Sequence, residues 1–65
     1  MPKYPNIKVK IIGANGNAFT IIGKCVNAAK RAKVSSEEIT LFKDEALGGD
    51  YNHLLQTCMK WFSVS

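Results

Sequence analysis

The sequence predicts a compact α+β domain of three helices and a small two-stranded antiparallel ribbon, in the order β-α-α-α-β. Three observations lead to this fold class. An alternating apolar segment stands near the N-terminus, three amphipathic segments with capping residues follow, and a short alternating segment ends the chain. The 65 residues make one domain, 1–65, and a hydrophobic fraction of 46% is ordinary for a globular protein.

Residues 1–5 hold both prolines and are expected to form an extended arm. In residues 6–12, apolar side chains alternate with Lys8 and Lys10, which predicts a half-buried strand with a basic outer face. The last residues, 62–65, also alternate. We expect them to pair with the first strand and so bring the two ends of the chain together.

Residues 13–17 read Gly-Ala-Asn-Gly-Asn and admit two interpretations. An Asn-Gly pair between apolar runs is typical of a β-hairpin, whereas Asn17 is a good N-cap for a helix. The apolar residues that follow recur at helical intervals over four turns, from Ala18 to Ala32, and this spacing favours a helix. Gly23 lies inside that helix, at a cost of about 1 kcal/mol relative to alanine, and is expected to mark a close helix contact.

Capping residues predict two further helices. Ser35 and Glu38 form a capping box, in which each side chain accepts a backbone N–H, and the helix should turn Ile39, Phe42 and Ala46 inward. The pair at 48–49 ends this helix, because glycine suits a left-handed C-terminal residue. Asp50 then caps the third helix at once. The expected apolar side of that helix consists of Tyr51, Leu54, Leu55, Cys58, Met59 and Trp61.

Charge is divided unevenly along the chain. The first 34 residues carry seven basic side chains and no acid, while the rest carries two basic side chains and five acids, so +7 and −3 sum to +4. Such a division suggests an anionic ligand for the first part, or head-to-tail association of two copies. A chain of this length buries only about 60% of its unfolded surface, so we also expect a homo-oligomer.

The candidate ligand site is the loop 13–17 with the cations near it. Glycines between a strand and a helix let the backbone approach a ligand, and N–H groups at a helix start attract anions. The loop lacks the ending of a Walker motif and the third glycine of the dinucleotide fingerprint. The alternative is a structural turn with a plain helix cap. The residues expected to bind a phosphate are Lys10, Gly13, Asn15, Gly16, Asn17, Lys24, Arg31 and His53.

The cations of the first helix have an ordinary explanation too. Basic residues near the C-terminal end of a helix stabilise its dipole and face solvent. A phosphate-binding role gains support only if they are contiguous with Lys8 and Lys10 of the strand. A base-reading helix-turn-helix is disfavoured, because the second helix carries four acids that would repel nucleic acid.

Catalysis, a cofactor and a metal site are not expected. His53 is the only histidine and has no nucleophile placed by sequence to partner it, so a capping role or a ligand hydrogen bond is favoured. Cys25 and Cys58 fit no metal-ligand spacing. Because the chain shows no secretory signal and no membrane-spanning run, reduced buried thiols in a cytoplasmic protein are favoured over a disulfide.

Three strings carry a resemblance to other proteins: Gly-x-Asn-Gly-Asn-Ala-Phe at 13–19, Gly-Asp-Tyr-x-His-Leu-Leu at 49–55 and Met-x-Trp at 59–61. Together they resemble a group of short uncharacterised proteins from bacteria and phages, over nearly the whole chain. The resemblance implies a small stand-alone protein, phage-encoded, and it carries no particular activity over to this chain. Small phage proteins often bind and block host factors, including nucleotide signals, which is an analogy only.

We therefore expect a small non-enzymatic binding module that holds an anionic, phosphate-bearing small molecule, a nucleotide, and sequesters a host nucleotide signal. Two alternatives stay open. One is an inhibitor or adaptor that binds a host protein through its charged halves, and the other is a non-specific nucleic-acid binder. No membrane partner is expected.

Overall fold

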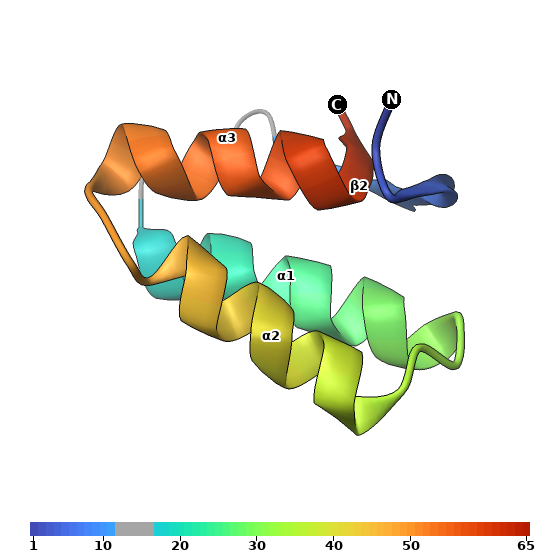
Figure 1. The fold of residues 1–65 in the computed structure, drawn as a ribbon. Coiled ribbons are helices and arrows are strands. Elements are labelled where there is room, and N and C mark those ends of the chain that lie inside the picture. Colours follow the sequence, from blue (N-terminus) through green and yellow to red (C-terminus); the bar gives the residue numbers. More distant parts are fainter. Residues whose placement is uncertain (12–16) are drawn as a thin grey trace.

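Two short strands, β1 (Tyr4–Val9) and β2 (Phe62–Val64), lie side by side at one end of the molecule (Figure 1). Between them the chain forms α1 (Ala18–Arg31), α2 (Ser36–Ala46) and α3 (Tyr51–Trp61). This computed structural model describes residues 1–11 and 17–65. The predicted order of elements is confirmed, and α1 packs against β1 while α2 packs against α3.

The two strands are parallel, so the predicted antiparallel ribbon is wrong. Tyr4 is paired with Phe62, Lys8 with Ser63 and the last residue of β1 with that of β2. A parallel pair needs a connection of a dozen residues or more, which the three helices supply. Alternation of apolar residues shows that a segment is a strand, but it carries no information about the direction in which its partner runs.

The first strand begins earlier than the sequence suggested. Tyr4 and Pro5 belong to β1 instead of an arm over 1–5, and the backbone N–H of Lys3 donates to the carbonyl of Lys60 at 2.9 Å. Pro5 has no N–H to donate to the ladder, and the register shifts in the interval that contains it. Of the strand expected over 6–12, the last residue lies outside the described part.

Each helix begins after the cap residue that the sequence predicts: Asn17 for α1, Ser35 for α2 and Asp50 for α3. In each cap the side-chain oxygen accepts a first-turn N–H, at 2.9 Å for Asn17, 3.2 Å for Ser35 and 2.9 Å for Asp50. These bonds satisfy backbone donors that have no partner inside a helix. The helical interpretation of the segment after residue 17 is confirmed over the hairpin.

The core is built around aromatic side chains from different elements. The ring of Phe42 in α2 packs edge-on against two other rings. Its centroid lies 5.6 Å from that of Trp61 and 5.1 Å from that of Phe62. The inward residues predicted for α2 are buried, as are Leu54 and Cys58 of α3. Thirteen hydrophobic residues of the described part are buried: Ile7, Val9, Ile21, Ile22, Cys25, Ala29, Ile39, Phe42, Ala46, Leu54, Cys58, Trp61 and Phe62.

The buried stripe of α3 is narrower than predicted. Tyr51 and Met59 are 40% and 54% exposed, whereas Thr57 is buried and donates its hydroxyl to the carbonyl of His53 at 2.8 Å. The buried residues of α3 lie on one helical face, and Met59 projects from another. They are Leu54, Thr57, Cys58 and Trp61. None of the three helices has the length and hydropathy that a membrane crossing requires, among the residues described.

Candidate functional site

A basic groove lies between β1 and α1. We use this name for the hollow of about 350 Å³ whose walls come from the end of β1 and from one stripe of α1. Four of its six lining residues are cations. The lining consists of Lys8, Val9, Lys10, Lys24, Ala28 and Arg31.

The spacing of these residues explains how they reach one groove. In α1, Lys24, Ala28 and Arg31 are separated by four and three residues, so they lie on one face of the helix. Seven residues of helix rise about 10 Å, which sets the two cations apart with a methyl group between them. On the other wall, Lys8 and Lys10 are exposed on one side of the extended chain, while Val9 turns into the core.

The charge of the groove is not neutralised by neighbouring acids. The ion pairs within residues 1–11 and 17–65 join Lys3 to Glu38 and Lys60 to Glu45. Neither involves a cation of the basic groove. Four positive charges around one concave surface raise the local concentration of anions.

The structure brings together three of the residues that the sequence singled out, namely Lys10, Lys24 and Arg31. The cations of α1 are also contiguous with Lys8 and Lys10, as a phosphate-binding role requires, because all of them line the same hollow. Lys8 was not among the expected binding residues. Its spacing of two from Lys10 was the signal that could have found it, since such residues share a strand face. The expectations at Gly13, Asn15 and Gly16 lie outside the described residues.

Asn17 stands immediately before α1 and acts as its cap. Its Oδ1 accepts from the backbone N–H of Phe19 at 2.9 Å and more weakly from that of Thr20 at 3.4 Å. Asn17 does not line the basic groove, and its contacts support the role of a helix cap.

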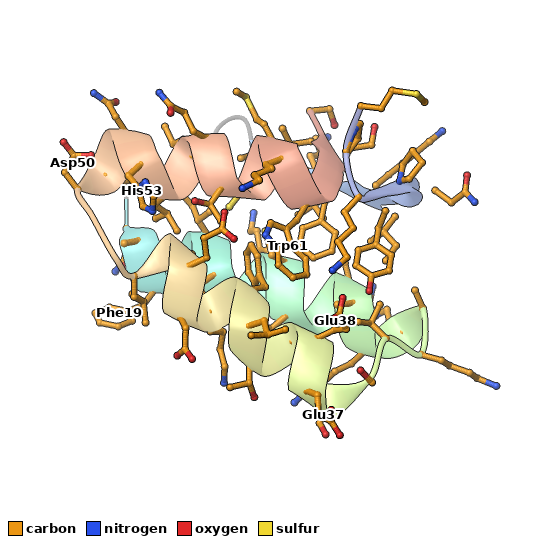
Figure 2. All side chains as sticks on the ribbon, in the orientation of Figure 1. Phe19, Glu37, Glu38, Asp50, His53 and Trp61 are labelled. Atoms are coloured by element: carbon orange, nitrogen blue, oxygen red, sulfur yellow. The ribbon has the colours of Figure 1, made fainter. Side chains whose placement is uncertain are left out.

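His53 does not line the basic groove. Its Nε2 lies 2.7 Å from the carbonyl oxygen of Glu45, at the corner between α2 and α3 (Figure 2). A carbonyl only accepts, so Nε2 carries the proton and donates it. The carbonyl of Glu45 also accepts the backbone N–H of Gly48 at 3.1 Å, so His53 adds a second donor to a carbonyl at the end of α2. The capping role is thus the one that the contacts of His53 support.

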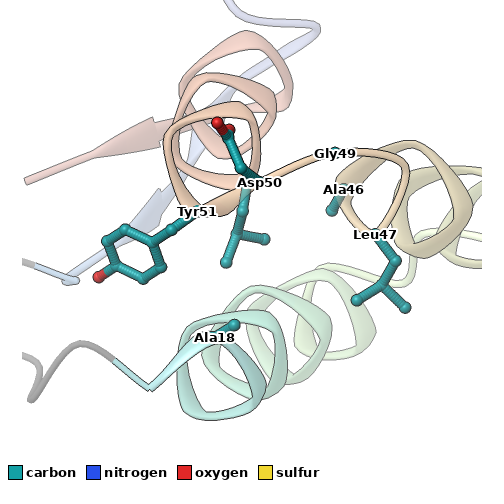
Figure 3. Close-up of a pocket in the computed structure, with 7 residues that line it drawn as sticks. Ala18, Ala46, Leu47, Gly49, Asp50 and Tyr51 are labelled. Carbon is teal, nitrogen blue, oxygen red and sulfur yellow. The ribbon is translucent and has the colours of Figure 1, made fainter.

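A second hollow, of about 140 Å³, lies where the start of α1 meets the α2–α3 corner (Figure 3). It is smaller than the roughly 300 Å³ at which small-molecule sites begin. No cation lines it, and the carboxylate of Asp50 is used in the cap of α3. Its lining consists of Ala18, Ala46, Leu47, Gly49, Asp50, Tyr51 and Leu54.

Among the described residues, no three histidine, cysteine or acidic side chains gather where a metal ion could bind. Comparisons of the chain with models of protein families, with curated proteins and with solved structures found no match. The resemblance to short bacterial and phage proteins therefore stays an expectation from the sequence, and the basic groove is the candidate site on its geometry alone.

Proposed function

We propose that the protein binds a phosphate-bearing anion, of the nucleotide class, in the basic groove between β1 and α1. The observation that carries the proposal is the convergence of four cations, from two separate segments of the chain, on one hollow. A solvated helix face would explain Lys24 and Arg31, but it would not explain why Lys8 and Lys10 line the same space.

The chemistry of the lining suits phosphate. The guanidinium of Arg31 offers parallel N–H donors that match two oxygens of a phosphate, and the lysines add compact charges that adapt to its position. The floor at Ala28 is a half-buried methyl group, which leaves room for an uncharged part of the ligand. The volume of about 350 Å³ lies at the lower end of the range for small-molecule sites, which fits one nucleotide.

The role that follows is binding without a reaction. A protein of this kind would act by holding its ligand away from another protein, which is how the sequestration of a host nucleotide signal would operate. Binding of a host protein through the charged halves is the alternative if the basic groove holds no small molecule.

The test is calorimetric titration with mono-, di- and cyclic nucleotides, using two variants. Lys24→Ala removes one charge from the basic groove and keeps a strong helix former. We expect it to weaken binding about tenfold or more while the free energy of unfolding changes by less than about 0.5 kcal/mol. Lys43→Ala is the matched control, because Lys43 is an exposed helical lysine of α2 that does not line the basic groove.

Equal weakening by the two variants would mean that net charge, not the basic groove, attracts the anion. A steep fall of affinity with salt for any single-stranded or duplex oligonucleotide would instead indicate non-specific nucleic-acid binding. If no nucleotide binds to the wild-type protein at millimolar concentration, the proposal is wrong and the protein-binding alternative takes its place.

A further inference from the structure

Two cysteine thiols meet in the core, between helices that are far apart in the sequence. The Sγ atoms of Cys25 in α1 and Cys58 in α3 are 3.6 Å apart, and the thiol of Cys25 donates a hydrogen bond to that of Cys58. Both side chains are fully buried, and both thiols are free. The two residues are 33 positions apart, so the contact depends on the tertiary fold.

We infer that Cys25 and Cys58 form a redox site, at which a small disulfide such as oxidised glutathione converts the two thiols into an intrachain disulfide linking α1 to α3. The inference does not depend on the proposed ligand, since neither cysteine lines the basic groove.

The geometry favours a bond between these two sulfurs over any other reaction. A disulfide has an S–S distance of about 2.05 Å, so closing the present gap requires each sulfur to move by less than about 1 Å. Rotation about the two Cα–Cβ bonds provides movements of this size. Metal binding is a poorer use of the pair, because the described residues offer no third ligand beside it.

The reaction balances as two thiol–disulfide exchanges. The thiolate of one of the two cysteines attacks one sulfur of oxidised glutathione, which forms a mixed disulfide and releases one glutathione thiolate. The thiolate of the other cysteine then attacks the protein sulfur of the mixed disulfide, the protein disulfide forms, and the second glutathione thiolate leaves. The two thiol protons of the protein end on the two glutathione molecules, so the cysteines are oxidised and one glutathione disulfide is reduced.

The contact between the thiols shifts their pKa values in opposite directions while the fold is closed. The hydrogen bond to Cys58 and burial in the core both raise the pKa of the Cys25 thiol. At Cys58, the hydrogen bond received from Cys25 lowers the pKa and outweighs the opposing effect of burial. These shifts belong to the closed fold, which glutathione does not enter, so they do not fix which cysteine attacks first.

Burial also sets the rate of the reaction. Since neither sulfur is exposed, glutathione reaches the pair only when α1 and α3 separate, and the same burial then protects the disulfide from reduction. Oxidation of the folded protein should accordingly be slow in buffer and faster in mild urea.

The experiment measures the equilibrium between the two thiols and the disulfide. Refolding from urea lets glutathione reach the cysteines before the core closes. The chain is denatured in urea and refolded in glutathione redox buffers, then treated with acid and a maleimide, and analysed by intact mass. We expect a monomer lighter by two hydrogens, with no maleimide adduct. The folded chain should form the disulfide at a ratio of oxidised to reduced glutathione about a hundredfold lower than the chain in urea, because native proximity favours the bond. The melting temperature of the oxidised form should exceed that of the reduced form by about 10 °C or more.

The variants Cys25→Ala and Cys58→Ala are the controls, and each should keep one thiol that carries glutathione or maleimide. The inference is wrong if the wild-type chain gives disulfide-linked dimers or two glutathione adducts at the same ratios. It is equally wrong if the folded and urea-denatured chains need the same ratio, or if the oxidised form melts at a lower temperature than the reduced form.

Discussion

The hydroxyl of Tyr4 donates a hydrogen bond of 2.8 Å to Oε1 of Glu38, which joins the first strand to α2. Lys3 forms an ion pair with the same oxygen, and its ammonium lies 4.5 Å from the centroid of the Trp61 ring. The N-terminal residues are therefore docked on two helices. Glu38 uses its carboxylate for this contact, so the predicted capping box is present only in its Ser35 half.

The contact between Tyr4 and Glu38 can be tested by removing one hydroxyl. Tyr4→Phe keeps the aromatic ring that stacks near Trp61 and leaves the carboxylate of Glu38 with one donor fewer. We expect a lower midpoint of urea denaturation with an unchanged m-value. Tyr51→Phe, at an exposed tyrosine, is the control and should change the midpoint much less. Equal effects of the two variants would mean that the bond adds nothing to stability.

The same cluster makes stability depend on pH at both ends of the scale. Hydrogen bonds from Lys3 and Tyr4 lower the pKa of Glu38 below its ordinary value of 4.5. Its contribution is therefore full above about pH 4.5 and is lost as the pH falls through the lowered pKa. The hydrogen bond to Glu38 raises the pKa of Tyr4 above 10.0, so its contribution is full below pH 10 and is lost at higher pH.

Melting temperatures from pH 2 to pH 7 provide the measurement for Glu38. Glu38→Gln should flatten the acid limb of the profile, because the amide does not titrate. Glu37→Gln, at the exposed neighbouring acid, should leave that limb close to the wild-type one. An acid limb that is unchanged by Glu38→Gln would show that other carboxylates control the acid response.

The Ser35 cap gives a prediction with a magnitude. Ser35→Ala removes the oxygen that accepts the N–H of Glu38 at 3.2 Å and should cost about 1 kcal/mol of unfolding free energy. Ser36→Ala, one residue inside α2, has no cap to lose and is the control. Glu38→Ala should cost more than Ser35→Ala, because it removes the contacts of Glu38 with Tyr4 and Lys3.

Signals that are local in the sequence were sufficient to predict where the helices begin. Asn17, Ser35 and Asp50 are caps whose side chains act within three residues along the chain, so their effect is visible in the sequence. The direction of β2 was not predictable, because it depends on a pairing between segments more than fifty residues apart. The docking of Tyr4 on Glu38 is non-local in the same way.

The candidate site was predictable only in part. Lys10, Lys24 and Arg31 were identified from charge and spacing, but whether strand and helix cations share one surface depends on the packing of α1 against β1. For His53 the sequence left a capping role and a ligand hydrogen bond open, because its partner, the carbonyl of Glu45, is a backbone group that no sequence pattern marks.

Self-association of the chain stays a prediction. Light scattering between micromolar and millimolar protein concentration would check it by measuring the molar mass in solution.

The end of α1 carries a strained lysine. Lys33 has a φ of 63°, in the left-handed region, and the N–H of Val34 donates to the carbonyl of Ala29 at 3.0 Å. These features form a Schellman motif, in which glycine usually occupies the left-handed position that Lys33 holds here. Lys33→Gly should therefore stabilise the protein by about 1 kcal/mol in urea denaturation. Lys30→Gly, inside the helix, should destabilise it by a similar amount.

Gly23 and Gly49 differ in whether the structure leaves room for a Cβ atom. The position of a Cβ at Gly23 meets no described atom within 4 Å, so the predicted close helix contact is wrong, and Gly23→Ala should add about 0.5 to 1 kcal/mol of stability. At Gly49 a Cβ would lie 2.7 Å from Cγ of His53 and 2.8 Å from its Cβ. Neither Gly48 nor Gly49 has a left-handed φ, so the reason for glycine at 49 is this close approach and not the expected helix-ending conformation.

Gly49→Ala should consequently push the imidazole of His53 away and break its 2.7 Å bond to the carbonyl of Glu45. We expect a loss of about 1 to 3 kcal/mol, the usual range for overpacking. The attribution can be checked with a double-mutant cycle. If the side chain of His53 is what the new methyl group meets, Gly49→Ala should cost much less in a protein that already carries His53→Gly, because the Cβ, Cγ and Cδ2 atoms that it would crowd are then absent. Additive losses would show that the backbone at residue 49, and not the contact with His53, requires glycine.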